Sequence, residues 1–293
     1  MNSVTVCDPA SKRSYQAGGP VYETDDVWCG SGRDPQLGEI FVKLLRYEPR
    51  TDKAKMIRSQ ARQEAETMLR AARCTSGVPK LYAHWDDQAH NAYVLVMQKM
   101  PGVTLRRWLQ KRSPVRADEK TLWLHTLILR QVAQILMEIH NQIPGISHRD
   151  LKPENVMIWY NQEKRWQVAV IDFGTAALNY SVRVGTYGYQ SPEQVSLQST
   201  IMGSGEAKDV FSLGMMWYEL LTGTPANELY RQFRIDTQEQ RWLSRPSLPD
   251  QIRATAEGER YNRLFEKMTA FDPAKRPSLR DVVNNIQYRR KTR

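Results

Sequence analysis

The sequence predicts an α+β protein with two unequal lobes: a small sheet with one helix, followed by a large and mainly helical body. The first third of the chain is rich in strand-like apolar segments, and segments with helical periodicity dominate after Pro101 and Gly102. The composition is that of a globular protein, with 41% hydrophobic and 25% charged residues. We therefore expect an N-terminal lobe over residues 1–97, a C-terminal lobe over residues 98–293 and a ligand cleft between them.

The first lobe is predicted from three segments. Residues 39–45 (EIFVKLL) and 91–100 (NAYVLVMQKM) are apolar and rich in β-branched residues, and polar turns bound both of them. Residues 52–73 contain no glycine or proline, and alanine, isoleucine and methionine recur there at helical spacing. The pattern is therefore strand, helix, strand.

The second lobe is predicted to be built around two long helices. Residues 120–142 carry leucine, isoleucine and valine on one side, which is typical of an amphipathic helix. Residues 208–223 (KDVFSLGMMWYELLTG) form an apolar segment that ends in Gly223, a common residue at a helix C-terminus. Between these helices, apolar residues after position 155 and residues 167–171 indicate two short strands.

Composition also bounds the class of protein. Three widely spaced cysteines fit neither a disulfide framework nor a zinc site, and residues 1–14 lack the apolar core of a signal peptide, so we expect a cytoplasmic protein without membrane contact. The net charge of +10 would favour polyanions such as nucleic acid. The basic segments 106–116 and 288–293 carry no nucleic-acid-binding signature, and we interpret them mainly as solvated faces.

The segment most informative about chemistry is residues 145–160, GISHRDLKPENVMIWY. Asp150, Lys152 and Asn155 follow one another in a polar loop, and Asp172 comes at the end of the next apolar stretch, in VIDFG. Phosphoryl transfer needs a carboxylate that orients the attacking hydroxyl and takes its proton, hard oxygen ligands for Mg²⁺, and a cation on the transferred phosphate. Asp150 matches the first task, Asn155 and Asp172 match the second, and Lys152 matches the third.

The motifs HRDLKPEN and DFG resemble the catalytic loop and the metal-binding turn of the eukaryotic-type protein kinase catalytic domain, including its bacterial type. The resemblance implies a bilobal fold with a small antiparallel sheet, ATP and Mg²⁺ as cofactors, and protein substrates phosphorylated on serine or threonine. It also implies that Asp150 is the catalytic base, that Asn155 and Asp172 bind the metal, and that Lys152 assists the transfer.

Further segments resemble this family in its usual order, over about residues 15–287. In GTYGYQSPE, Thr186 stands where the family has a threonine that contacts the catalytic aspartate, and Glu193 where it has the partner of an arginine, here Arg276. Asp209 in DVFSLG resembles the aspartate that braces the catalytic loop. His148 is expected to pack as a structural imidazole that holds the loop.

In the small lobe, IFVK resembles the family's nucleotide-binding strand, so that Lys43 would contact the α and β phosphates. Its partner would be Glu64 on the following helix, with Glu66 as the second candidate. Met97 would stand at the entrance to the adenine pocket. The remaining residues that the resemblance assigns to the nucleotide are Val27, the backbone of Gln98 and Met100, and Met157 beneath the base.

The sequence departs from the family in its glycine-rich loop. Counting back from VWCG at 27–30, the positions of the three glycines hold Pro20, Tyr22 and Asp25. The segment GSG at 30–32 is followed by Arg, Asp and Pro, and we interpret it as a hairpin turn rather than a phosphate loop. Phe41 replaces a small alanine beside the adenine. These departures favour an alternative function, that of a pseudokinase scaffold that binds partners with little or no phosphotransfer.

Two further expectations concern regulation and the basic surface. Arg149 precedes the catalytic aspartate, and in the family such an arginine often binds a phosphate on the activation segment. We therefore hypothesise autophosphorylation at Ser181 or Thr175. A third reading of the chain, a nucleic-acid-binding protein on a kinase-like frame, rests on net charge alone.

Overall fold

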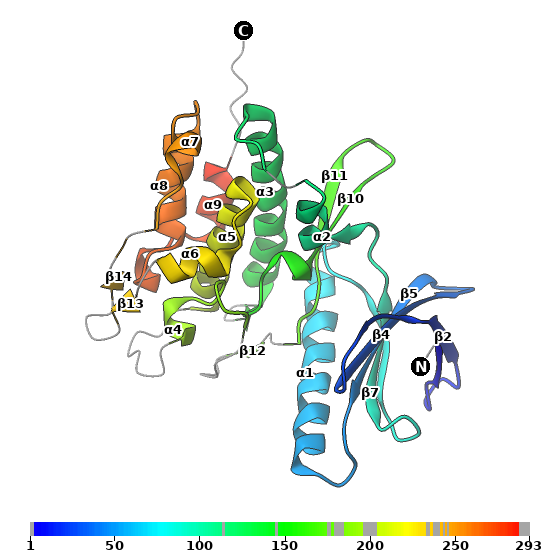
Figure 1. Ribbon diagram of the computed structural model, residues 1–293. Helices are drawn as coiled ribbons and strands as arrows, with labels where there is room; N and C mark the ends of the chain where they lie inside the picture. Colours follow the sequence, from blue (N-terminus) through cyan, green and yellow to red (C-terminus); the bar gives the residue numbers. More distant parts are fainter. Residues whose placement is uncertain are drawn as a thin grey trace. The chain divides into compact units, whose positions relative to one another are not determined.

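The computed structural model has two compact units, Met1–Pro101 and Gly102–Arg293 (Figure 1). The fold class is α+β, as predicted: the first unit holds an antiparallel sheet and one long helix, and helices dominate the second. Among the described helices, none is both long and apolar enough to cross a membrane. The structure describes residues 3–112, 115–143, 146–174, 177–178, 185–195, 204–232, 235–236, 241–242, 244 and 246–286.

The first unit is built on a five-stranded antiparallel sheet. Its strands lie in the order β3 (Pro20–Glu23), β4 (Val27–Asp34), β5 (Gly38–Arg46), β7 (Ala92–Gln98) and β6 (Leu81–Asp87). The predicted strands 39–45 and 91–100 are β5 and β7, which pair in the sheet. The predicted helix is α1 (Asp52–Cys74), whose N-cap Thr51 accepts a hydrogen bond from Ala54 N. It packs on β5, β6 and β7.

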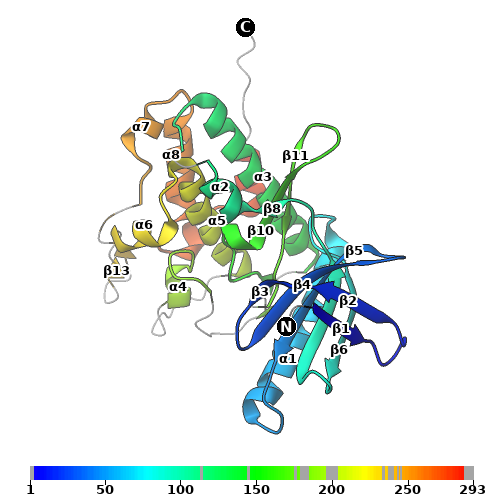
Figure 2. The ribbon, with the colours of Figure 1, turned by 45° about the vertical axis from the view of Figure 1, so that its right-hand side comes forward.

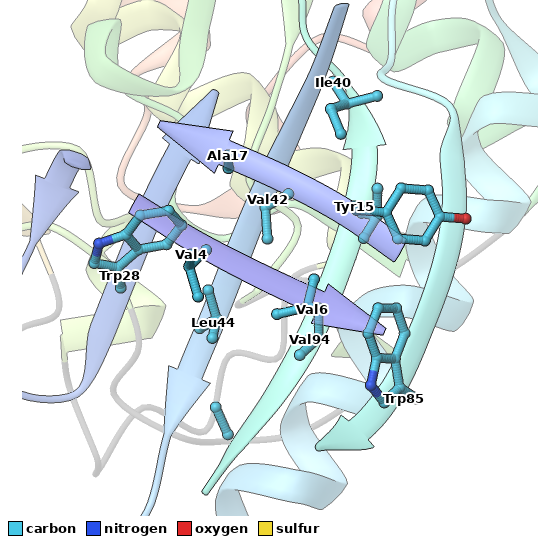
Figure 3. Packing of buried hydrophobic residues seen from close by; sticks show 12 residues of the cluster. Val4, Val6, Tyr15, Ala17, Trp28, Ile40, Val42, Leu44, Trp85 and Val94 are labelled. Carbon is cyan, nitrogen blue, oxygen red and sulfur yellow. The ribbon is translucent and has the colours of Figure 1, made fainter. Parts of the chain in front are cut away.

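A second, smaller hairpin covers the other face of this sheet (Figure 2). It consists of β1 (Ser3–Cys7) and β2 (Ser14–Gly18), in which buried and exposed residues alternate. Figure 3 shows β1 and β2 crossing the strands beneath them, so that apolar side chains of both layers meet. This core was not predicted, and it comprises Val4, Val6, Tyr15, Ala17, Trp28, Ile40, Val42, Leu44, Trp85, Ala92, Val94 and Val96.

The interpretation of GSG as a hairpin turn is wrong. Residues 30–32 lie inside strand β4, and the turn to β5 is formed by residues 35–37, whose backbone Asp34 caps by accepting from Gln36 N and Leu37 N at 2.8 and 2.9 Å. The glycines are required by the hairpin above the sheet. A Cβ atom on Gly32 would lie 1.9 Å from the backbone oxygen of Gln16. Gly30 and Gly32 therefore let the backbone of β2 approach β4 closely.

Replacing Gly32 with alanine is expected to lower the free energy of unfolding by about 1–3 kcal/mol, because the β2 backbone would have to move away from β4. Urea unfolding of the purified chain measures the change. Gly18→Ala is the matched control, since a Cβ there meets its nearest atom, Ser31 O, at an ordinary 3.6 Å. Equal unfolding midpoints for the two variants would contradict this account of the hairpin.

The second unit is organised around α3 (Glu119–Gln142) and α5 (Gly205–Thr222), which pack side by side (Figures 1 and 2). Nearly every side chain of α5 is buried, and Gly223 caps its end with φ of +75°. Both helices were predicted. The other helical segments are α2 (Leu105–Gln110), η1 (Pro153–Asn155), α4 (Pro192–Val195), α6 (Ala226–Gln232), α7 (Asp250–Arg253), α8 (Gly258–Met268), η2 (Pro273–Lys275) and α9 (Leu279–Asn285).

Short strands in this unit place the polar loops. The loop that contains Asp150 runs from β9 (Ile146–Ser147) to β10 (Val156–Tyr160), and Asp172 follows β11 (Trp166–Val170). Because β10 and β11 pair antiparallel, with Val156 opposite Val170, the end of the loop and the segment after β11 lie next to each other. The remaining strands are β8 (Val103–Thr104), β12 (Ala177–Leu178), β13 (Ile235–Asp236) and β14 (Arg241–Trp242).

Candidate active site

An ion pair in the first unit joins the sheet to its helix. Ile40, Val42 and Leu44 of β5 belong to the core beneath the hairpin, so the alternating residue Lys43 points to the opposite face, toward α1. Lys43 Nζ lies 2.7 Å from Glu64 Oε1, and the side chains are 14% and 3% exposed. Glu64 sits on the buried face of α1 beside Ala61 and Ala65. The sequence predicted this partner, whereas Glu66 is exposed.

Glu64→Gln is expected to lower the free energy of unfolding by about 1.5–3 kcal/mol, because the hydrogen bond to the Lys43 ammonium loses its charged acceptor. The exposed neighbour supplies the control: Glu66→Gln should change stability by no more than about 0.5 kcal/mol. Thermal unfolding of both variants decides between the two glutamates. A larger loss for Glu66→Gln would show that the pair does not hold α1 to the sheet.

In the second unit, one buried carboxylate holds the loop before Asp150. Asp209 of α5 is 1% exposed and accepts hydrogen bonds from His148 N at 3.0 Å, from Arg149 N at 3.3 Å and from Ser147 Oγ at 2.9 Å. Its other oxygen lies 2.9 Å from His140 Nε2. These bonds hold Arg149 at φ of +65°, an unfavourable conformation for a residue other than glycine. Asp209 therefore braces this loop, as the motif predicted.

The charge state of Asp209 follows from these partners. Burial alone would raise the pKa of its carboxyl, but the hydrogen bond and charge of His140, together with the charge and backbone N–H of His148, outweigh burial and hold the pKa below its ordinary value of 3.8. The group is thus ionised at neutral pH. His148 itself is buried, and its Nε2 lies 3.1 Å from Ile171 O, so it holds the loop to the segment before Asp172.

Three side chains converge on Asp150. Thr186 Oγ1 donates to Asp150 Oδ1 at 2.7 Å, and Lys152 Nζ lies 2.7 Å from Asp150 Oδ2 and 2.6 Å from Thr186 Oγ1. Asn155 Nδ2 donates to the backbone oxygen of Asp150 at 2.8 Å and to its Oδ2 at 3.2 Å. The structure thus brings together four of the residues singled out in the sequence.

Asp172 is attached to this group through the backbone. Ile171 N donates to Asn155 O at 2.9 Å, which places Asp172 one residue from the end of the loop, and its φ of +62° is unusual for aspartate. Because Asn155 Nδ2 is engaged by Asp150, its amide oxygen points away from that contact. A carboxylate and an amide oxygen form a hard donor set of the kind that suits Mg²⁺ when phosphate oxygens and water complete the coordination. Asn155 and Asp172 would hold that metal.

The residues assigned to the nucleotide base lie in both units. Val27 is the first residue of β4, and Met157 lies in β10 opposite Ala169. Gln98 N is occupied, because it donates to Lys80 O at 2.8 Å, so an adenine could bond only its carbonyl. Met100 is 8% exposed, and its backbone forms no hydrogen bond within the part of the chain that the structure describes. The backbone of Met100 could therefore accept a hydrogen bond from a ligand or donate one to it.

The stretch that replaces the glycine-rich loop is a tight acidic turn. Thr24 N donates to Val27 O at 2.8 Å, and Val27 N returns a bond to Thr24 Oγ1 at 3.1 Å. Asp25 and Asp26 lie between them, and Lys53 Nζ contacts Asp26 Oδ1 at 2.9 Å. Two exposed carboxylates at this tip disfavour an approaching anion. Phe41 is half-buried opposite Met97 in the neighbouring strand.

Two ionic contacts hold the segment that follows Gly185. Arg276 donates to both oxygens of Glu193, at 2.6 and 2.8 Å, in a buried bidentate pair that the motif predicted. A second cluster was not predicted: Arg106 of α2 contacts Glu154, Tyr189 and Glu219. Sequence reasoning placed Arg106 in a solvated basic segment, and no local pattern in that segment indicates its contacts with Glu154 and Glu219.

The predicted phosphate acceptors Ser181 and Thr175 lie outside the described residues. The expected phosphate ligand, Arg149, is described: it is 6% exposed, and burial lowers the pKa of its guanidinium. Lys208 lies close enough for Arg149 to contribute, after burial, to a lowered pKa of its ammonium. Arg149 and Lys208 are therefore close enough for their charges to interact.

Comparisons with known proteins agree with the motifs. The family model described as "Protein kinase domain" matches residues 35–286. Mouse "Inactive serine/threonine-protein kinase PLK5" is 27% identical and aligns with 95% of this chain and 43% of its own length. "Probable serine/threonine-protein kinase nek2" of Dictyostelium discoideum is 29% identical, covering 70% and 47%. "Serine/threonine-protein kinase PknB" of Mycolicibacterium smegmatis is 32% identical, covering 64% and 29%. The chain thus spans less than half the length of each of these three relatives.

Proposed function

Because the chain belongs to the protein kinase domain family, we propose that it is an enzyme that transfers the γ-phosphate of ATP to serine or threonine hydroxyls of proteins. One observation carries the proposal: Asp150 is held by Thr186, Lys152 and Asn155 in a single hydrogen-bonded group. A scaffold that only binds partners has no need of a carboxylate oriented in this way.

The proposed mechanism gives each residue of this group a task. The substrate hydroxyl oxygen bonds to the γ-phosphorus, the bond to the β-phosphate oxygen breaks, and ADP leaves while Asp150 accepts the hydroxyl proton. Lys152 places its ammonium on the charge of the transferred group. Thr186 donates to Oδ1 of Asp150, and together with Lys152 and Asn155 at Oδ2 it holds the carboxylate in one orientation. Mg²⁺, held by Asn155 and Asp172, would neutralise phosphate charge.

In the first unit, Lys43 would contact the α and β phosphates, and Glu64 would hold its ammonium in place. The free backbone of Met100 and the carbonyl of Gln98 would bond the adenine. Val27 and Met157 would contact its faces. A cytoplasmic location is part of the proposal and rests on the three cysteines, which form no disulfide.

We propose in addition that the enzyme phosphorylates itself at Ser181 or Thr175. The supporting observation is the cationic pair of Arg149 and Lys208, because a guanidinium and an ammonium close together favour a doubly charged phosphate. Mass spectrometry of the chain before and after incubation with MgATP tests this. Full activity of a chain that carries no phosphate at any stage would contradict it.

The second candidate function is that of a pseudokinase scaffold. The acidic turn at residues 24–26 favours it, since Asp25 and Asp26 stand where phosphates would be approached by backbone N–H groups. The mouse relative, which is named an inactive serine/threonine-protein kinase, supports the absence of phosphotransfer in this candidate function.

Labelling with γ-radiolabelled ATP separates the two functions. The proposed enzyme should incorporate label into itself and into a general acceptor protein only when Mg²⁺ is present, and hydrolysis of the product should release phosphoserine or phosphothreonine. A scaffold should bind nucleotide weakly or not at all and label nothing. Label recovered only as phosphotyrosine would contradict the proposed specificity but not the enzymatic class.

A further inference from the structure

A cluster of charged and polar side chains surrounds Arg106 beside the catalytic loop, and its hydrogen bonds are formed within the chain. The guanidinium of Arg106 donates through Nε to Glu154 Oε1 at 2.7 Å and through Nη2 to Tyr189 Oη at 2.9 Å. It also contacts both oxygens of Glu219, with Nη2 to Oε2 at 3.4 Å, and Tyr189 Oη donates to Glu219 as well. The acceptors come from three elements that are distant in sequence.

These acceptors belong to the segments that position the proposed catalytic residues. Glu154 lies in the loop between Lys152 and Asn155, and Tyr189 follows closely after Thr186, the partner of Asp150. A peptide whose hydroxyl reaches Asp150 must therefore pass near the two carboxylates. Two glutamates and a tyrosine hydroxyl around one point form a site for a cationic side chain, because a guanidinium fits several oxygen acceptors at once.

The burial of Glu219 makes a cation necessary at this site. Glu219 is 2% exposed, so its charge needs a counterion, whereas Glu154 is 45% exposed and reaches solvent. Arg106 is 23% exposed, which leaves it accessible from the surface rather than sealed in a core. The site is thus a half-open acidic subsite whose cation is supplied by the protein.

We propose that Arg106 is an internal cation that fills this subsite, so that the enzyme selects acceptor peptides without requiring a basic residue near the phosphorylated hydroxyl. The inference rests on the proposed kinase function and concerns its substrate class. Without Arg106, Glu154 and Glu219 would attract an arginine of the substrate instead. Arg106 is in this account a specificity-determining residue and not a catalytic one.

Peptide selection tests the proposal directly. A set of serine peptides carries one arginine, moved through the positions on either side of the serine, against an alanine in the same place. For the wild type, we expect kcat/KM ratios near one at every position. For Arg106→Ala, we expect a preference of about tenfold or more for arginine at one position, since charge-assisted bonds discriminate at that level. The exposed neighbour Arg107→Ala is the matched control and should behave as wild type.

The double variant Arg106→Ala/Glu219→Gln should lose most of the new preference, because the buried charge that attracts the arginine is gone. The proposal is overturned if the wild type already prefers arginine tenfold at any position. It is also overturned if Arg106→Ala and the wild type show the same ratios.

A second readout needs no phosphotransfer and so separates this inference from the proposed function. Ethylguanidinium chloride at millimolar concentration should raise the Tm of Arg106→Ala by refilling the subsite, and should leave Arg107→Ala and the wild type unchanged. If no variant transfers phosphate, this shift still supports the subsite while the kinase proposal fails. No shift in Arg106→Ala, or a variant that cannot fold even with ethylguanidinium, would show that Arg106 is structural and overturn the inference.

Discussion

Asp150→Asn is expected to lower the rate of γ-phosphate transfer by about 10²- to 10⁴-fold, the usual contribution of a positioned general base. Asparagine has nearly the same shape as aspartate and can still contact Thr186 and Lys152, but it cannot accept the proton of the substrate hydroxyl. The loss should therefore fall on kcat, with the KM for ATP little changed. Steady-state labelling of an acceptor protein measures both constants.

The control for this variant is Glu163→Gln, which removes a carboxylate at the exposed tip of the β10–β11 hairpin, where it pairs with the neighbouring Arg165. It should transfer phosphate at the wild-type rate. Circular dichroism should give the same spectrum and Tm for both variants. If Asp150→Asn retained more than about a third of wild-type kcat, the proposed base would have to be abandoned.

Asp209→Ala is expected to lower the free energy of unfolding of the second unit by about 3–5 kcal/mol. The substitution removes a carboxylate that is 1% exposed. It leaves the hydrogen-bond donors of this carboxylate without an acceptor, and these donors include His148 N, Arg149 N and Ser147 Oγ. Urea unfolding followed by tryptophan fluorescence measures the loss. Asp250→Ala, at a side chain that is 96% exposed, should cost no more than about 0.5 kcal/mol.

The carboxylate of Asp209 also makes a pH-dependent contribution to the free energy of unfolding, and the sign of this contribution follows from its lowered pKa. A group with a depressed folded-state pKa contributes stability fully above its unfolded pKa, about 3.9 for aspartate, and loses it as pH falls through the lower folded value. The stability difference between the wild type and Asp209→Ala should thus be constant near neutral pH and shrink in acid. A difference that grows below about pH 4 would contradict the ionised, hydrogen-bonded state.

The parts of the site that were predictable share one physical property: their geometry is set locally. In HRDLKPEN a few consecutive residues form one loop, and the residue types alone state which chemistry the loop supports. Lys43 and Glu64 were predicted from the resemblance of IFVK and the following helix to the kinase family, and the structure shows that they meet because strand alternation and the buried face of α1 bring them together. Where a single period or a single loop decides the position, the sequence is sufficient.

The parts that were missed depend on contacts between segments far apart in the chain. The glycines at residues 30–32 are explained only by the β1–β2 hairpin lying over β4, a layer that no local pattern announces. Arg106 was interpreted as a surface charge because its neighbours in the sequence are basic. Its partner, the buried Glu219, lies in a helix that was predicted from its apolar residues. Local sequence patterns do not specify pairs between segments that are far apart in the chain.

The central claim is that Asp172, with Asn155, holds the magnesium of a bound nucleotide. The most direct test is the rate of labelling as a function of Mg²⁺ concentration for the wild type and for Asp172→Ala. We expect the wild-type rate to rise from background and saturate, and the variant to stay lower by about 10²-fold or more even at saturating Mg²⁺. Superimposable magnesium curves for the two proteins would contradict the account.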